Sequence, residues 1–179
     1  AVMSANDASV ACAEYVAGSD AEFVARMNGK AHELGMRNSF FLNPNGLPAK
    51  GQTTTARDIL TLTLNYIHHF PQVMPIHAMQ YYSYNNINQH NRNNLLKIYP
   101  EVDGLKTGFI CESGYHIIIT AKRGKTRLIA VVMGAQTRGI RTRETKKLLE
   151  TGFKIIDGDV SNVASRATSF PAERRNIKN

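Results

Sequence analysis

Apolar residues recur at helical spacing throughout the first 70 residues, which predicts a mostly helical N-terminal part. A Ser-x-x-Glu capping box at Ser19 and Glu22 starts the second of these helices, and Gly35 ends it. Thr54 is the expected N-cap of the third helix. The three helices are predicted over residues 4–16, 19–34 and 54–70.

Beyond residue 80 the apolar residues change from helical spacing to short strand-like runs. Two such runs, residues 115–120 and 128–133, flank a turn at residues 123–125 and therefore predict a β-hairpin. A shorter strand is predicted over residues 80–84. The asparagine-rich stretch 85–94 is predicted to be irregular.

Helical spacing returns over residues 141–153, and the sequence becomes polar beyond Gly158. Helices followed by strands and a final helix predict an α/β chain of the α+β type, with a helical part packed on an antiparallel sheet. We divide the chain into a helical portion (1–79), a sheet with the last helix (80–157) and a polar tail (158–179).

Composition limits the class of protein without identifying it. A chain of 179 residues with 42% apolar residues is long enough to bury the core of one globular domain. No apolar run approaches the roughly 18–20 residues of a membrane span. The net charge of +8 most simply serves solubility, and a nucleic-acid binder would rest on this charge alone.

Neither cysteines nor histidines predict a structural cross-link or a metal site. Two cysteines make no disulfide framework in a chain of this length, so they can pair or stay free. Of the two, Cys12 and Cys111, the second is expected to be a small buried apolar residue. The histidines lack metal-ligand spacing and no glycine-rich phosphate loop is present, so no cofactor is expected.

Two short motifs carry the candidate chemistry: Ser-x-Asn at Ser4 and Asn6, and Lys-Thr-Gly at residues 106–108. The second motif precedes the predicted hairpin, which places it on a strand at the edge or mouth of the sheet. There, Lys106 would supply a fixed positive charge and Thr107 a hydroxyl for a substrate carboxylate, while an extended peptide could add to the strand edge. For the first motif taken alone, the simpler interpretation is a helix N-cap.

Together with their flanks, the two motifs resemble the D-alanyl-D-alanine carboxypeptidases, which are the low-molecular-mass penicillin-binding proteins of serine peptidase family S11. The flanks are Asn-Pro-Asn-Gly-Leu-Pro at 43–48, Thr-Ala-Arg-Asp at 55–58, Val-Asp-Gly-Leu at 102–105 and the apolar run at 128–134. The resemblance covers about residues 1–156 and implies a β-lactamase/transpeptidase-like fold. It places the active site in the cleft between the helical part and the sheet.

The resemblance also implies a mechanism and partners. In the family, the serine of a Ser-x-x-Lys motif attacks the penultimate D-Ala carbonyl of a peptidoglycan stem peptide, and water later releases the acyl group. β-Lactam antibiotics acylate the same serine. Ser4 matches a serine that relays a proton, Asn6 an asparagine that orients the substrate, and Lys106 and Thr107 the motif that binds the substrate carboxylate. The implied location is the periplasmic or extracellular face of a bacterial cell envelope.

Three further positions complete the site that the resemblance implies. Gly108 lets a ligand approach the strand closely, and the backbone N–H of Phe109 would supply half of an oxyanion hole. Arg141 matches an arginine that holds the terminal carboxylate, a task for which Arg138 and Arg143 compete in the sequence. Phe109 stands where histidine or tyrosine is more usual in the family.

The chain departs from the family pattern in one major respect: none of its serines is followed three residues later by lysine. We therefore expect a fragment that lacks the nucleophile and its part of the fold, is inactive alone, and forms a dimer or retains a separate N-terminal piece. A non-catalytic module that binds peptidoglycan or β-lactams is the main alternative. A class A β-lactamase is disfavoured because no Glu-x-x-Leu-Asn string is present.

Overall fold

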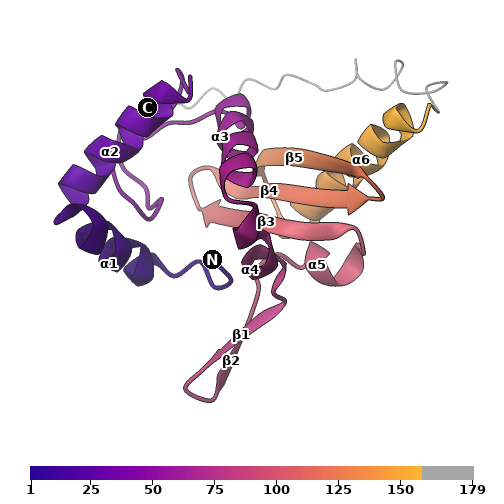
Figure 1. The fold of residues 1–179 in the computed structure, drawn as a ribbon, viewed down its shortest axis with the longest axis horizontal. Helices are drawn as coiled ribbons and strands as arrows, with labels where there is room; N and C mark the ends of the chain where they lie inside the picture. The colour runs from indigo at the N-terminus through magenta and orange to yellow at the C-terminus, as the bar shows by residue number, and fades with distance from the viewer. Residues whose placement is uncertain (159–179) are drawn as a thin grey trace.

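A three-stranded antiparallel sheet, in the order β3-β4-β5, lies at the centre of the molecule (Figure 1). The computed structural model describes residues 1–158, and the expected polar tail beyond Gly158 lies outside this range. The strands are β3 (Val102–Ile110), β4 (Gly114–Arg123) and β5 (Thr126–Ala135). The hairpin predicted from the two apolar runs is confirmed as β4 and β5, which pair across a short turn.

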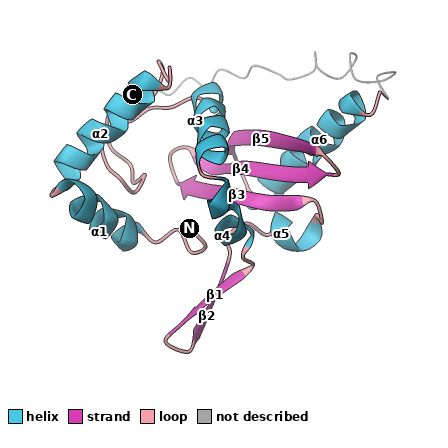
Figure 2. Ribbon diagram, in the orientation of Figure 1, coloured by secondary structure: helices cyan, strands magenta, loops and turns pink. Residues whose placement is uncertain are grey.

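Helices cover both faces of this sheet (Figures 1 and 2). α6 (Arg138–Ile156) lies behind the sheet in Figure 1, and buried residues of β4 and α6, such as Ile117, Ile119, Leu149 and Phe153, form the core between them. In front lie α3 (Ala56–His69), the 3₁₀ turn η1 (Pro71–Val73) and α4 (Met74–Ala78). The short helix α5 (Leu95–Ile98) precedes β3.

Two N-terminal helices, α1 (Asn6–Ala17) and α2 (Asp20–Glu33), pack against one another beside the sheet. Ser19 caps α2 as predicted, because its side chain accepts a hydrogen bond from the Glu22 N–H. Within residues 1–158, no helix combines the length and the apolar character needed to cross a bilayer.

The start of α3 differs by one residue from the prediction. Thr55, not Thr54, is the N-cap, since its hydroxyl accepts from the Asp58 N–H at 3.1 Å. Thr54 instead pairs with the Ser39 hydroxyl at 2.8 Å, and the buried Asp58 carboxylate also binds Ser39. The threonine that lies three residues before the aspartate therefore takes the cap, while its neighbour fixes the preceding loop.

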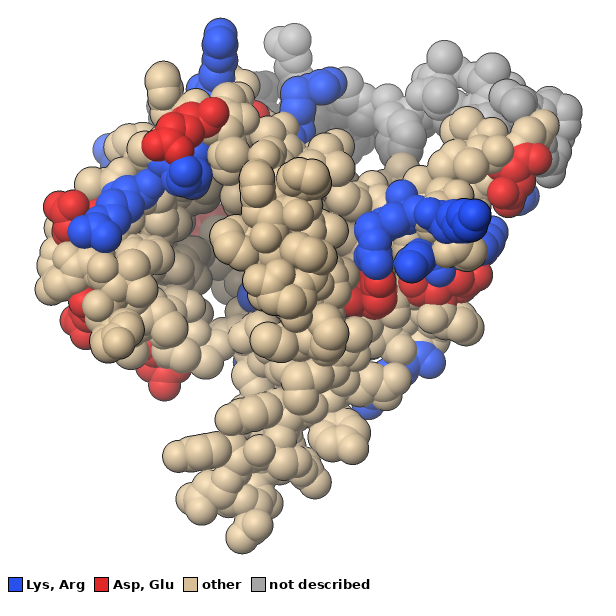
Figure 3. Space-filling view, viewed as in Figure 1, with Lys and Arg blue, Asp and Glu red and all other residues tan. Residues whose placement is uncertain are grey.

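A second, two-stranded sheet projects from the body of the molecule as a hairpin (Figures 1 and 2). It consists of β1 (Tyr81–Tyr84) and β2 (Ile87–His90). The strand predicted over residues 80–84 is confirmed as β1, whereas the prediction of irregular structure over 85–94 is wrong for residues 87–90, which form β2. Asn85 and Asn86 adopt φ values of 48° and 61°, which suit a tight hairpin turn and which asparagine tolerates better than most residues. In Figure 3 this projection carries no charged side chain.

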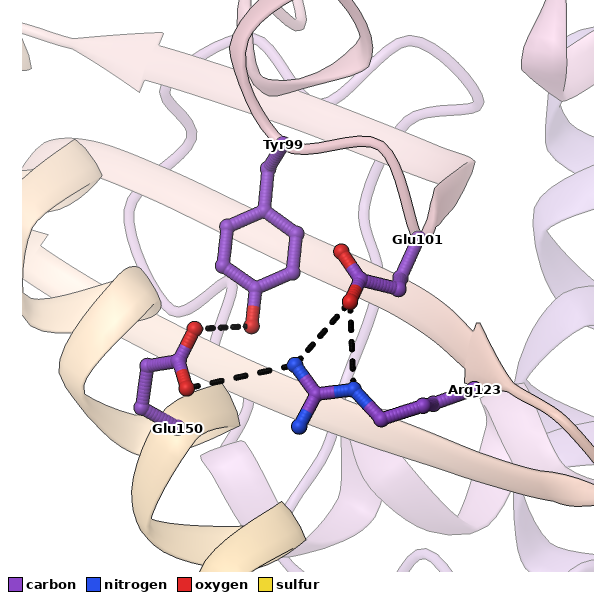
Figure 4. A network of polar contacts seen from close by, with 4 residues as sticks. All are labelled: Tyr99, Glu101, Arg123 and Glu150. Carbon is purple, nitrogen blue, oxygen red and sulfur yellow. Dashed lines mark hydrogen bonds and ion pairs between the residues drawn. The ribbon is translucent and has the colours of Figure 1, made fainter.

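A polar network attaches α6 to the sheet (Figure 4). The Tyr99 hydroxyl donates to Glu150 of α6 at 2.6 Å, and Arg123 of β4 donates to Glu101 through Nε and Nη2 at 3.1 and 3.0 Å. The Arg123 guanidinium also lies 4.1 Å from the centre of the Phe153 ring. Burial and the Glu150 carboxylate both raise the pKa of the Tyr99 hydroxyl, so this group remains a hydrogen-bond donor.

We expect Tyr99→Phe to lower the free energy of unfolding by about 1 kcal/mol, because it removes one charge-assisted hydrogen bond without changing the packing of the ring. Urea denaturation of the two proteins measures the difference. Tyr15→Phe is the matched control, since Tyr15 is 92% exposed. Equal effects of the two substitutions would contradict a bracing role for the Tyr99–Glu150 bond.

Candidate active site

The fold brings together the two motifs that the sequence singled out. The Lys106 ammonium donates to the Ser4 hydroxyl at 2.6 Å, across 102 positions of sequence. A second bond, also 2.6 Å, joins the ammonium to the carbonyl of Thr107. Lys106 lies on β3, which is an edge strand of the sheet as predicted for Lys-Thr-Gly.

The backbone of Ser4 adopts an unusual conformation, and the residue does not cap α1. Its φ of 57° lies in the left-handed region, which residues other than glycine seldom adopt outside functional or strained sites. The N-cap of α1 is Ala5, so the interpretation of Ser4 as a helix cap is wrong. Asn6, the first residue of α1, lines the same pockets as Ser4.

The surroundings of Lys106 adjust its acidity. Burial, together with the positive charge of Arg92, lowers the pKa of the ammonium. A lysine with a lowered pKa gives up a proton more readily near neutral pH, which suits a group that exchanges protons with a hydroxyl. The short contact to Ser4 supplies a path for such an exchange.

Two pockets adjoin along β3 and share the motif residues. The pocket on the α3 side is lined by Ser4, Asn6 and Lys106 together with the loop over residues 41–47 and Met133. The other pocket is lined by Ser4, Asn6 and Thr107 and reaches the first turn of α6. Ser4, Asn6, Thr107, Gly108 and Phe109 line both. The motifs therefore form the common wall of the two pockets.

A buried guanidinium lies in the second pocket. Arg141 is only 3% exposed, and its Nε and Nη2 have no hydrogen-bond partner. Burial and the charge of Arg138 both lower the pKa of Arg141. An unpaired buried cation is unfavourable, whereas a carboxylate would accept both free N–H groups. Of the competing arginines, Arg143 is exposed and pairs with Glu144. It does not line this pocket.

The end of β3 shapes the wall between the pockets. A side chain on Gly108 would lie 3.7 Å from the His116 Cβ, so the glycine leaves the strand surface open beside that ring. The Phe109 side chain is half exposed and stacks on Tyr115, with ring centres 4.3 Å apart. The oxyanion role of the Phe109 N–H remains a prediction.

His116 and Ser113 form a polar pair that the sequence did not reveal. His116 Nε2 lies 2.7 Å from the Ser113 hydroxyl, and His116 Nδ1 accepts the Gly134 N–H at 3.1 Å. Because Nδ1 accepts this bond, the proton of the neutral ring is on Nε2 and is donated to Ser113. Both side chains line the α3-side pocket, and His116 lies opposite Gly108 on the paired strands. A serine and a histidine three residues apart give no signal in sequence, and the Gly134 N–H reaches the ring only because β5 pairs with β4.

Burial and the nearby charge of Arg141 lower the pKa of His116 below its ordinary value of 6.5, so folding favours the neutral ring. The unfolded chain then binds more protons, and stability is present above pH 6.5 and decreases as the pH falls from 6.5 through the folded pKa. We expect His116→Asn to weaken this decrease in urea denaturation measured at a series of pH values. Burial also lowers the pKa of His77, so this residue is expected to account for the pH dependence of stability that remains in the variant.

An unaltered slope in His116→Asn would contradict the burial of a neutral imidazole at this position.

The cysteines remain separate in the structure. Cys12 and Cys111 are both free and exposed. The prediction that Cys111 is buried is wrong, because it lies in the turn between β3 and β4, at the rim of a shallow pocket beside Phe109. Among residues 1–158, no group of His, Cys, Asp or Glu side chains is arranged to hold a metal ion.

Comparison with known proteins identifies the family of the chain. The family model described as D-alanyl-D-alanine carboxypeptidase matches residues 1–137. The chain belongs to the D-alanyl-D-alanine carboxypeptidase family. Members of this family include D-alanyl-D-alanine carboxypeptidase DacC of Escherichia coli, to which the chain is 44% identical over 157 residues, 87% of the chain and 39% of the relative.

Solved structures of related carboxypeptidases and penicillin-binding proteins confirm the transpeptidase-like fold. Penicillin binding protein 5 from Haemophilus influenzae matches with a TM-score of 0.82 at 39% identity, over 85% of this chain and 45% of that one. Penicillin-binding protein D2 from Listeria monocytogenes, solved with cefotaxime bound, matches with a TM-score of 0.79 at 36% identity, over 86% of this chain and 63% of that one. The chain spans about two fifths of the length of the curated relatives that it matches.

Proposed function

We propose that the protein to which this chain belongs is a serine-type D-Ala-D-Ala carboxypeptidase that removes the terminal D-alanine from peptidoglycan stem peptides. The observation that carries the proposal is the 2.6 Å bond between Lys106 and Ser4. It joins two motifs of the family into one proton path beside a pocket that contains an unpaired guanidinium. Family membership supports the same activity.

The residues of the site each have a task in the proposed reaction. Arg141 and Thr107 bind the carboxylate of the terminal D-Ala, which places the scissile amide at the wall shared by the two pockets. Asn6 hydrogen-bonds an amide of the substrate, and Phe109 N–H stabilises the oxyanion. Ser4 donates its proton to the leaving amine nitrogen and is reprotonated by Lys106.

The proposed reaction also requires a nucleophile. We propose that it is the serine of a Ser-x-x-Lys motif in a part of the protein outside the printed sequence, since none of the serines in the sequence has that neighbour. The lysine of that motif takes the proton of the serine hydroxyl as the oxygen adds to the carbonyl carbon. The C–N bond to the terminal D-Ala then breaks as the amine nitrogen takes a proton from Ser4, and water hydrolyses the acyl-enzyme. β-Lactams would acylate the same serine.

The apolar groove between α3 and the sheet supports a proposal for where that segment packs. Ile59, Ile118, Val131 and Met133 line this groove, which adjoins Lys106. Coexpression of this chain with the piece that contains the nucleophile is expected to give a stable complex. A chain that instead forms only dimers on a sizing column would contradict this packing.

The direct test uses the complete protein. Incubation with a fluorescent penicillin is expected to give a covalent adduct on the serine of the Ser-x-x-Lys motif, and a peptide ending in D-Ala-D-Ala is expected to lose one D-Ala. Peptide binding without an adduct would favour the non-catalytic module, and rapid turnover of penicillin would favour a β-lactamase. We also propose that the protein acts on the periplasmic or extracellular face of the envelope, which protease accessibility in intact cells would test.

A further inference from the structure

A long uncharged segment separates the two halves of the active site in sequence. Residues 59–91 contain no Lys, Arg, Asp or Glu, although 20% of the whole chain is charged. The segment covers most of α3, the α4 region and the projecting β1–β2 hairpin. Figure 3 shows this surface as a continuous uncharged area, with the charged side chains gathered on either side of it.

The hairpin presents aromatic rings to solvent on a defined face. Tyr82 pairs with Gln89 and Tyr84 with Ile87, and residues directly opposite on antiparallel strands share a face. Tyr82 is 45% exposed, Tyr84 68% and Ile87 59%. No ring contact among the described residues involves either tyrosine. These rings therefore contribute little to the core and are available to a ligand.

The body of the protein holds the base of the hairpin in place. The Asn91 N–H donates to the Gln80 carbonyl at 2.8 Å, and the Asn91 side chain donates to the Met79 carbonyl at 2.9 Å. Gln80 in turn donates to the Leu96 carbonyl at 3.3 Å. A fixed aromatic face loses little conformational freedom when it binds, which favours recognition.

The chemistry of this face selects among partners. Nucleic acids and anionic lipid surfaces attract Lys and Arg, which are absent from the hairpin. Insertion into hydrocarbon would bury the amides of Asn85 and Asn86 at the tip without partners, which is unfavourable. A neutral sugar polymer matches the face, because its C–H surfaces pack on tyrosine rings and its hydroxyl and acetamido groups bond to amide side chains.

We propose that the Tyr82–Tyr84 face of the hairpin binds a neutral, N-acetylated polysaccharide chain, which, if the proposed function holds, is the glycan strand that bears the stem peptides. The position of the hairpin agrees with this. Arg92 follows β2 by two residues, lines the Arg141 pocket and donates to the Met3 carbonyl at 2.9 Å. A glycan held on the hairpin would raise the local concentration of stem peptides at the site.

The test measures binding of hexameric N-acetylglucosamine, and of peptide-free glycan strands, to the complete protein by calorimetry. Tyr82→Ala with Tyr84→Ala is expected to weaken binding about tenfold or more, because two stacking contacts are lost. Tyr15→Ala, on a solvent-exposed ring of α1 away from the hairpin, is expected to leave binding unchanged. The rate of penicillin acylation should be the same in all three proteins, which also shows that the double variant is folded.

A second variant, Tyr84→Ala alone, is expected to show a smaller loss and guards against misfolding of the double variant. Absence of glycan binding in the wild type, or equal binding by the double variant, would overturn the proposal. The proposal would also be overturned if the wild type bound phosphatidylcholine vesicles or self-associated and the double variant did not. The face would then serve a membrane or a second copy of the chain. Glycan binding without a penicillin adduct would refute the proposed enzyme but not this surface.

Discussion

Replacing Lys106 by alanine in the complete protein is expected to slow acylation by penicillin about 10³-fold, the range typical of a lost proton-transfer group. The ammonium is the donor to both Ser4 and the Thr107 carbonyl, so its removal breaks the proton path and frees the start of α1 from β3. Stopped-flow measurement with a fluorescent penicillin gives the rate. The pH dependence should also lose the limb that reports the lysine.

Lys125 provides a matched control, because Lys125-Thr126 repeats the first two residues of the motif in the turn between β4 and β5. Lys125→Ala is expected to acylate at the wild-type rate. If both variants acylated normally, the Lys106–Ser4 contact would have no part in the chemistry, and the proposed function would lose the observation that supports it.

Replacing Arg141 by methionine is expected to lower kcat/KM for a peptide that ends in a free D-Ala carboxylate by about 10²-fold, since two charge-assisted hydrogen bonds are lost. A peptide with an amidated C-terminus, which offers no carboxylate, should be affected little. Stability should not fall with activity. A buried cation with two unpaired nitrogens is replaced by an apolar side chain, so the free energy of unfolding is expected to stay equal or to rise.

Arg143→Met is the control for this substitution, because Arg143 is exposed on the same helix and paired with Glu144. Peptide hydrolysis and urea denaturation of both variants separate the two effects. A large loss of stability in Arg141→Met, with the free-acid and amidated peptides affected alike, would assign the arginine to the fold and not to the carboxylate.

The elements that were predicted correctly are those that local pattern specifies. The two apolar runs pair as β4 and β5, Ser19 caps α2, and Lys-Thr-Gly lies on an edge strand, each as expected. The strand β1 was predicted, but its partner β2 was missed because it is four residues long and mostly solvent-exposed, so it lacks the half-buried alternation that marks a strand. Asn85-Asn86 was the available signal for the turn of the hairpin.

The sequence predicted which residues form the site but not how they are arranged in space. Motif recognition selected Ser4, Lys106 and Arg141, yet no sequence rule gives a hydrogen bond across 102 positions or the burial of one arginine among three neighbours on a helix. His116 escaped notice for the same reason. Its partner Gly134 is adjacent only because β5 pairs with β4.

The two unpaired nitrogens of Arg141 have a consequence for how ligands of this protein can be discovered. A ligand that binds only the folded state stabilises that state by RT ln(1 + [L]/Kd). The melting temperature therefore reports whether a ligand occupies the site beside Arg141. Small carboxylates such as D-alanine or acetate, which cannot react, should therefore raise the melting temperature of the wild type and leave that of Arg141→Met unchanged. A simple melting screen would then sort non-covalent lead compounds by how well they satisfy one guanidinium.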